Sequence, residues 1–111
     1  MNDSEFHENV NQTMARIEAA IEAAVDSSGA DIDYETVSEI LTLEFENGNK
    51  IIINKQAAAH QIWVADKSGG FHFDYDEDRG QWLNDRSGAE LLSELSRFAS
   101  VQAGQAIDLK K

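Results

Sequence analysis

The sequence has 111 residues, which suits one domain covering residues 1–111. It contains no cysteine, which excludes a disulfide framework, a thiolate metal site and a thiol nucleophile, and fits a reducing compartment. The formal net charge is −12, which argues against nucleic acid and anionic membranes as partners and favours cations or a basic protein surface.

The stretch MNDSEFHENVNQ has no basic region followed by an apolar run, so we expect a soluble cytoplasmic protein with no targeting signal and no membrane span.

The N-terminal segment is predicted to form a helix. Apolar residues recur at steps of three and four, which indicates a helix with one buried face from about Ser4 to about Asp26. Ser4 is expected to cap this helix, and the stretch SSGA to end it.

After Gly29 the apolar period changes from helical to alternating, which predicts strands. In DIDYETV (31–37) Ile32, Tyr34 and Thr36 should share one face, while Asp31, Asp33 and Glu35 share the other. The stretch ILTLEFE (40–46) continues the alternation, and Asn47-Gly48 predicts a hairpin into KIIIN (50–54). Further strands are expected at QIWVA (61–65), GFHFDY (70–75) and QWLND (81–85).

A second helix is predicted near the C-terminus. Ser87 and Glu90 have the spacing of a capping box, and the buried side should consist of Leu91, Leu92, Leu95, Phe98, Ala99 and Val101. Two amphipathic helices and a meander sheet bury their apolar faces only when both helices cover the same side of the sheet. We therefore predict an α+β fold, a two-layer sandwich with both helices on one face of an antiparallel sheet and the other face in water.

The acidic residues are concentrated in the first part of the chain. Residues 1–46 hold twelve of the 21 acidic residues and a single base, Arg16, whereas the remainder holds nine acidic and eight basic residues. Glu18, Glu22 and Asp26 form a row at i, i+4 and i+8 that should run toward the carboxylates of the first strand. Repulsion among these carboxylates costs stability, and no lysine or arginine stands among them to offset it.

Such carboxylates are the ligands that hard cations prefer, and ligand type alone does not separate Fe, Mn, Ca and Mg. Alternate strand residues lie roughly 6–7 Å apart, too far to enclose one ion. A calcium loop starting at Asp31 fails because Thr36 and Thr42 stand where glycine and glutamate are required. Any metal binding should therefore be weak, exposed and permissive, and Asp3 with His7 at i, i+4 could share an ion. The alternative is a solvated acidic face without a ligand.

The sheet should also carry an exposed tryptophan. Ile62 and Val64 must face away from Trp63, and because the helices need an aliphatic floor we expect Trp63 to face outward, flanked by the polar Asn54 and Gln61. Trp82 fits either face. No Ser/His/Asp set and no phosphate-binding glycine loop is present, so we expect no classical catalytic centre.

The middle of the chain resembles the frataxin family. The matching stretches are NKQ (54–56), QIW (61–63), SGG (68–70), HFD (72–74), Trp82 and DRSG (85–88). The opening MNDSEFH and the run FENGNKIIIN are similar to the bacterial branch. This resemblance covers nearly the whole chain and implies an α-β-α sandwich, in agreement with the layering argued above.

The resemblance also implies a site and partners. It implies weak binding of Fe²⁺ and Fe³⁺, with other divalent or trivalent cations able to substitute, by a ridge of Glu18, Glu22, Asp26, Asp31, Asp33, Glu35 and Glu46, with Asp3, His7 and His60 as extra ligands. It implies docking on a cysteine desulfurase and its iron-sulfur scaffold complex through Asn54, Gln61, Trp63, Glu18 and Glu22. The implied role is a non-catalytic, monomeric regulator that adjusts cluster assembly to iron supply.

Two alternatives remain open at this stage. The chain could be a metal-independent interaction module that inhibits the desulfurase, or a weak ferroxidase. Two departures from the family pattern also matter: alanines in IEAAIEAAVD make the ridge thinner, and Ala58 stands where relatives often have proline. Since the chain has no proline at all, its loops gain entropy in the unfolded state, which predicts marginal stability.

Overall fold

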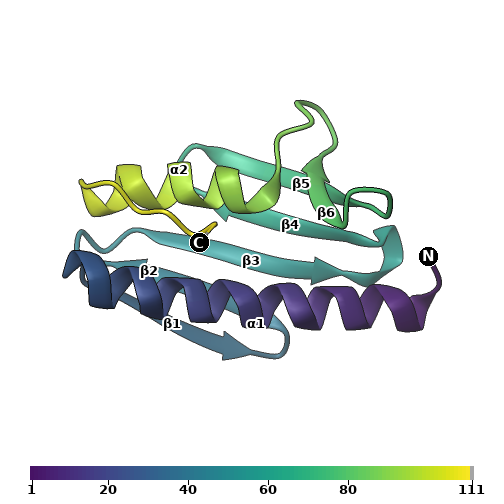
Figure 1. Cartoon of the computed structure of the whole chain (residues 1–111), viewed down its shortest axis with the longest axis horizontal. Coiled ribbons are helices and arrows are strands. Elements are labelled where there is room, and N and C mark those ends of the chain that lie inside the picture. The colour runs from purple at the N-terminus through teal and green to yellow at the C-terminus, as the bar shows by residue number, and fades with distance from the viewer. Residues whose placement is uncertain (111) are drawn as a thin grey trace.

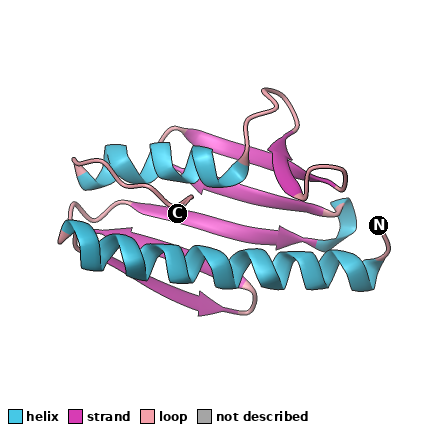
Figure 2. Ribbon diagram, viewed as in Figure 1, coloured by secondary structure: helices cyan, strands magenta, loops and turns pink. Residues whose placement is uncertain are grey.

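The computed structural model describes residues 1–110 and places two helices on one side of a six-stranded antiparallel sheet (Figures 1 and 2). Each strand pairs with its neighbour in sequence, so the strand order is β1-β2-β3-β4-β5-β6. The predicted two-layer fold is confirmed. The elements in chain order are α1 (Asp3–Ser28), β1 (Ile32–Val37), β2 (Ile40–Phe45), β3 (Lys50–Gln56), a short 3-10 helix (Ala57–Ala59), β4 (Gln61–Asp66), β5 (Gly69–Asp76), β6 (Gln81–Asn84) and α2 (Leu91–Ala103).

The hydrophobic core lies between the helices and one face of the sheet. The helix α1 runs along the β1 side of the sheet and α2 along the β6 side (Figure 1). Every second residue of the central strands points into this layer, and α1 contributes the apolar face predicted from its spacing. No helix within residues 1–110 is long and apolar enough to cross a membrane.

Both helices begin at caps other than those predicted. Asn2 caps α1: its side chain accepts from the Glu5 backbone N–H at 2.8 Å, and the Glu5 carboxylate accepts from the Asn2 backbone N–H at 3.1 Å. Asn2 and Glu5 have the spacing of a capping box, which Ser4 lacks because Gln or Glu does not stand three residues after it. The helix α2 starts at Leu91 and is capped by Glu90, whose carboxylate accepts from the backbone N–H groups of Leu92 and Ser93.

The predicted roles of Ser87 and Val101 are wrong. Ser87 lies in the turn before α2, where its hydroxyl accepts from the Ala89 backbone N–H at 3.1 Å. Val101 is 70% exposed because it falls outside the stripe that Leu91, Leu95 and Phe98 turn toward the core.

A two-residue hairpin that the sequence analysis did not predict separates β1 from β2. Val37 pairs with Ile40, and the two turn residues, Ser38 and Glu39, have φ of 52° and 66°. This left-handed conformation at both positions is that of a type I′ turn, which ordinarily uses asparagine and glycine. The predicted hairpin at Asn47-Gly48 is present, but only Gly48 has a positive φ there, so its turn is of a different type.

Replacing Ser38 with glycine is expected to stabilise the protein by about 0.5–1 kcal/mol, because glycine adopts a positive φ without the steric cost of a side chain. Thermal unfolding should show a midpoint higher by about 2–6 °C. The matched control is Ser4→Gly inside α1, where the same exchange should lower the midpoint. A midpoint for Ser38→Gly equal to or below that of the wild type would contradict a strained turn.

The C-terminal segment after α2 is part of the core. It returns between the two helices (Figure 1), where the side chains of Ile107 and Leu109 are buried. Two serines of α2 hold it: the Ser100 hydroxyl accepts from the Ile107 backbone N–H at 2.8 Å, and the Ser96 hydroxyl accepts from that of Leu109 at 2.9 Å. The segment thereby closes the groove between α1 and α2.

Candidate functional site

Two of the predicted ridge carboxylates lie where α1 meets β1. Ile32, Tyr34 and Thr36 share one face of β1, as predicted, and the structure turns this face toward α1. The polar ends of Tyr34 and Thr36 therefore reach carboxylates of α1. The Thr36 hydroxyl donates to Glu18 at 2.6 Å, and the Tyr34 hydroxyl donates to Glu22. The hydrogen bond to Glu22, with a smaller contribution from burial, raises the pKa of Tyr34 above 10.0.

Asp33 and Glu35 lie on the opposite, open face of the sheet. The strand register places Asp33 beside Glu44, and Glu44 beside Lys50, with which it forms an ion pair of 3.8 Å. These side chains line a shallow hollow of about 250 Å³ together with Glu35 and Thr42. The acidic residues therefore do not form the continuous row predicted from α1 to β1: the pleat of β1 divides them between two faces.

The other predicted ridge residues continue from these toward the C-terminal end of α1 and the start of β1. Asp26 is in the last turns of α1, Asp31 is in the short connection to β1, and Glu46 is exposed in the turn after β2. Within residues 1–110, no three histidine, aspartate or glutamate side chains come close enough to hold one metal ion. An ion at any of these carboxylates would therefore keep much of its water shell, as expected for the weak, exposed binding that the spacing predicts.

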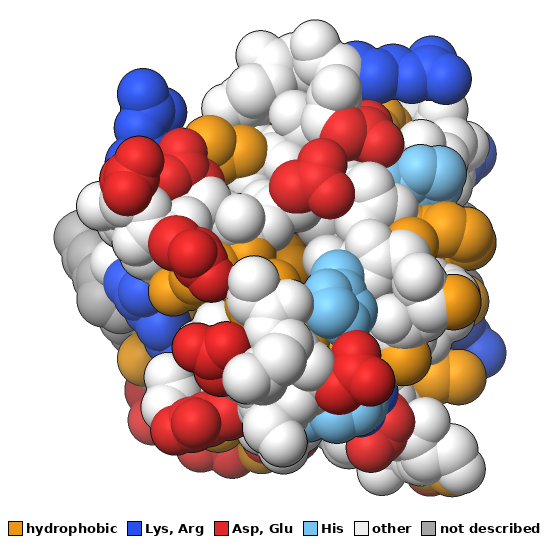
Figure 3. Space-filling view, turned by 90° about the vertical axis from the view of Figure 1, so that its right-hand side faces the viewer, with side chains coloured by type: hydrophobic (Ala, Val, Ile, Leu, Met, Phe, Trp, Pro, Cys, Tyr) orange, Lys and Arg blue, Asp and Glu red, His pale blue; other side chains and the backbone are white. Residues whose placement is uncertain are grey.

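At the N-terminal end, acidic and histidine side chains gather on the surface (Figure 3). The structure pairs Asp3 with His60, whose Nε2 lies 2.7 Å from the Asp3 carboxylate, rather than with His7. The His60 ring stacks on Phe6 with 4.8 Å between centroids, which fixes its orientation. Asp3 and His60 could together bind an ion only if the hydrogen bond between them were broken.

His7 contacts a lysine. Its Nδ1 lies 2.8 Å from the Lys55 ammonium, which can only donate, so Nδ1 is the acceptor and its lone pair is occupied. The Lys55 ammonium also lies 2.6 Å from the carboxylate of Glu39, one of the two β1–β2 turn residues with positive φ. The Lys55 side chain is only 7% exposed, so this contact anchors the turn to β3 and to the start of α1.

The ion pair with Lys55 makes a pH dependence testable. The hydrogen bond from Lys55 holds the pKa of Glu39 below 4.5. A lowered carboxyl pKa contributes stability that is present above the unfolded-state pKa and is lost as the pH falls through the folded-state value. The wild type should therefore be more stable than Glu39→Gln at about pH 6, and the difference should shrink toward about pH 3. Urea unfolding of both proteins across this pH range measures the difference in their free energies of unfolding. A difference that stays constant with pH would contradict the ion pair.

The open face of the sheet carries the predicted tryptophan. Trp63 is 36% exposed while Ile62 and Val64 are buried, which confirms the predicted orientation. Its ring stacks on His72 with 4.3 Å between centroids, and its Nε1 donates to the Gln61 side chain at 2.8 Å. On the neighbouring strand β3, Asn54 is paired with Trp63. Asn54, Gln61 and Trp63 are thus brought together, whereas Glu18 and Glu22 lie in the helix layer beside β1.

Apolar residues that the sequence analysis did not single out extend this surface. Val37, Ile40 and Ile52 are exposed on the same face as Trp63, at 57%, 37% and 39%. The alternation of the strands could have identified these residues from the sequence, because Val37 and Ile52 stand at outward positions. The other tryptophan, Trp82, is buried, and its Nε1 donates to the Thr13 hydroxyl of α1 at 2.9 Å.

These observations define a small two-layer α+β protein with an acidic helix-to-strand edge and an aromatic patch on its open sheet face. A frataxin-like domain model matches residues 1–105, and the chain belongs to the frataxin family. It is 46% identical over 108 residues to the iron-sulfur cluster assembly protein CyaY of Photobacterium profundum, and the match covers 97% of each chain.

Solved structures of other frataxins share this fold. A frataxin from Psychromonas ingrahamii, of the CyaY protein family, is 42% identical over all of both chains, with a TM-score of 0.84. A trimeric frataxin from the yeast Saccharomyces cerevisiae, complexed with ferrous iron, is 24% identical over 87% of each chain with a TM-score of 0.73, and shares the fold.

Proposed function

We propose that this protein takes part in iron-sulfur cluster assembly as an iron-binding regulator of the cysteine desulfurase and its scaffold. The observation that carries the proposal is the acidic edge around β1, where carboxylates of α1, β1 and β2 stand with little basic compensation. The support for the pathway is the 46% identity to an iron-sulfur cluster assembly protein over nearly the full length of both chains.

The proposed iron site is this edge, with Glu18 and Glu22 on the helix side and Asp33 and Glu35 on the open face. Hydrated Fe²⁺ and Fe³⁺ are hard cations that exposed carboxylates bind weakly, and other such cations should compete. A yeast member of the family has been crystallised with ferrous iron, which supports iron as the physiological cation. Asp26, Asp31 and Glu46 at one end, and Asp3, His7 and His60 at the other, would bind further ions less favourably.

The proposed partner surface has two parts. The acidic edge would meet a basic patch on the desulfurase, and the patch around Asn54, Gln61 and Trp63 would face the scaffold. Charge on the edge provides steering and salt dependence, whereas a partly exposed tryptophan provides a contact anchor. The protein would act as one domain and as a monomer, and without a catalytic centre.

A second candidate is an interaction module that inhibits the desulfurase whether or not iron is present. It is favoured by the apolar residues next to Trp63 and by the scattered positions of the carboxylates within residues 1–110. A weak ferroxidase is a third candidate; exposed carboxylates could assist Fe²⁺ oxidation, and saturable, protein-accelerated oxidation would identify it.

The test is desulfurase-driven cluster assembly across a range of Fe²⁺ concentrations, with the wild type and with Asp33→Asn/Glu35→Gln, which neutralises the open-face part of the proposed site. We expect the wild type to change the assembly rate in an iron-dependent way, and the variant to lose most of that dependence. Glu77→Gln/Asp78→Asn, in the turn between β5 and β6, removes the same charge away from β1 and should behave as the wild type. An effect that is equal at every iron level would favour the interaction module, and no effect at all would overturn the proposal.

A further inference from the structure

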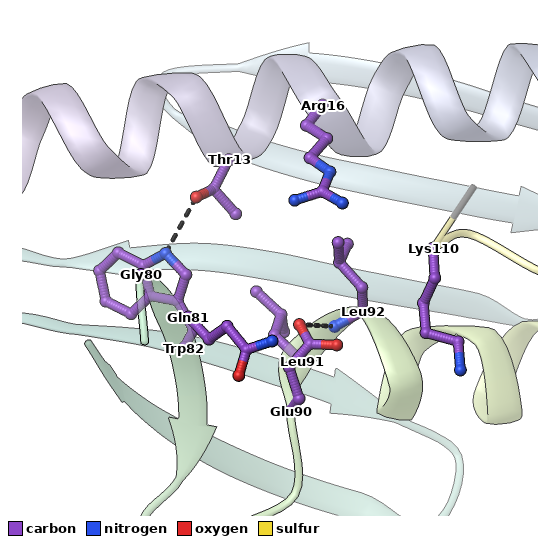
Figure 4. A pocket seen from close by; sticks show the side chains of 9 residues that line it. All are labelled: Thr13, Arg16, Gly80, Gln81, Trp82, Glu90, Leu91, Leu92 and Lys110. Carbon is purple, nitrogen blue, oxygen red and sulfur yellow. Dashed lines mark hydrogen bonds between the residues drawn. The ribbon is translucent and has the colours of Figure 1, made fainter. Parts of the chain in front are cut away.

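A polar cavity lies on the helix side of the molecule, away from the acidic edge. It has a volume of about 270 Å³ and opens between α1, the start of β6 and the N-terminal turn of α2 (Figure 4). The buried side chains of Trp82, Leu91 and Leu92 form its floor. Ligand pockets usually enclose ~300–1,000 Å³, so this cavity suits a small molecule with some apolar surface.

Two cations from different parts of the chain stand at this cavity. Arg16 comes from α1 and Lys110 from the C-terminal segment, and they flank Leu92 (Figure 4). Within residues 1–110, ion pairs engage Lys50, Lys55, Arg79 and Arg97 and leave four basic side chains without an acidic partner, namely Arg16, Lys67, Arg86 and Lys110. Two of these four therefore line the same cavity, in a protein whose net charge is −12.

The remaining polar groups of the cavity decide what it could accept. The Glu90 carboxylate lines the cavity and accepts from the backbone N–H groups of Leu92 and Ser93 and from the Ser93 hydroxyl; no ion pair joins it to Arg16 or Lys110. The Thr13 hydroxyl donates to the Asn9 carbonyl and accepts from Trp82. Gln81 contributes a side-chain amide that forms no hydrogen bond with another group of residues 1–110 (Figure 4). The cavity therefore presents two cations and one side-chain amide, beside one carboxylate whose oxygens already accept hydrogen bonds from α2.

We propose that this cavity binds a small organic carboxylate. The planar guanidinium of Arg16 can donate two parallel hydrogen bonds to a carboxylate, and Lys110 adds a second positive charge. The apolar floor favours an anion carried on a carbon skeleton over inorganic phosphate. The acidic residues elsewhere oppose binding little, because at physiological salt charges are screened beyond about 8 Å. This binding does not depend on the proposed role in cluster assembly.

The experiment is a titration of the full-length, ¹⁵N-labelled protein with succinate at constant ionic strength. We expect saturable shifts of the backbone amides of Gln81, Leu92 and Lys110 and of the Trp82 indole, with a dissociation constant in the millimolar range. The variant Arg16→Gln/Lys110→Gln should bind about tenfold more weakly, as two exposed ion pairs would predict. Both replaced side chains are exposed, so its amide spectrum should show a native fold.

The control variant is Lys67→Gln/Arg86→Gln, which removes the other two basic side chains of residues 1–110 that lack an acidic partner; both lie outside the cavity, so the affinity should be unchanged. Inorganic phosphate should bind more weakly than succinate; equal or tighter binding would overturn the assignment to a carboxylate. Shifts that remain linear to tens of millimolar, or that are the same in the Arg16→Gln/Lys110→Gln variant, would overturn the site.

Discussion

Replacing Leu109 with alanine is expected to lower the free energy of unfolding by about 2–5 kcal/mol, although Leu109 is close to the end of the chain. Its side chain is fully buried between the two helices, and its backbone N–H donates to the Ser96 hydroxyl at 2.9 Å. The truncation leaves a cavity that the helices cannot fill without moving. Stabilities of small proteins lie near 5–15 kcal/mol, so the variant should be partly unfolded on moderate warming.

Urea unfolding at 25 °C would measure this loss, with Val101→Ala as the matched control. Val101 is an apolar residue of α2 that is 70% exposed, and its truncation should change the stability by less than about 0.5 kcal/mol. A loss below about 1 kcal/mol for Leu109→Ala would mean that the C-terminal segment does not pack between the helices in solution.

Neutralising either part of the acidic edge is expected to weaken binding to the cysteine desulfurase about tenfold, and neutralising both about a hundredfold. This prediction rests on the proposed function. The helix part is tested by Glu18→Gln/Glu22→Gln, where glutamine still accepts from Thr36 and Tyr34. The open-face part is tested by Asp33→Asn/Glu35→Gln. The two effects should add because the pairs lie on opposite faces of β1 and share no partner.

Binding titrations at low and physiological salt provide the measurement, because attraction between exposed charges weakens as salt is added. Glu77→Gln/Asp78→Asn serves again as a control of equal charge change. If the desulfurase contacts only one face of β1, its affinity should fall for one of the two double variants and not for the other. Equal affinity for all variants would exclude the acidic edge from the interface.

Alternation and helical spacing were sufficient to predict the layers of this fold. Ile62 and Val64 had to face the helices, so the outward position of Trp63 followed from the side-chain period alone. The hairpin at Ser38 and Glu39 was missed because neither residue is one that type I′ turns ordinarily use. A signal was nevertheless present: the buried positions change from even numbers (Ile32) to odd numbers (Leu41), and a uniform strand does not allow that change.

The candidate site was predictable in residue type but not in arrangement. Composition identified a surplus of carboxylates, and the period placed Glu18 and Asp33 on their elements. Which face of the sheet each carboxylate would occupy relative to α1 depends on packing between the layers, so the division of the edge followed only from the structure. The contacts between Asp3 and His60 and between His7 and Lys55 join segments about fifty residues apart, which no local pattern indicates.

The position of β1 at the border of the sheet has a further consequence. An uncovered border strand is a template on which a second copy of the chain could extend the sheet. If two copies met along β1, the carboxylates of Asp33 and Glu35 in one copy would face those in the other, and their repulsion opposes that pairing. Cations or acid that neutralise these groups would remove the repulsion. If cations bind the acidic edge as proposed, the solubility of this chain and the occupancy of that edge are thermodynamically linked.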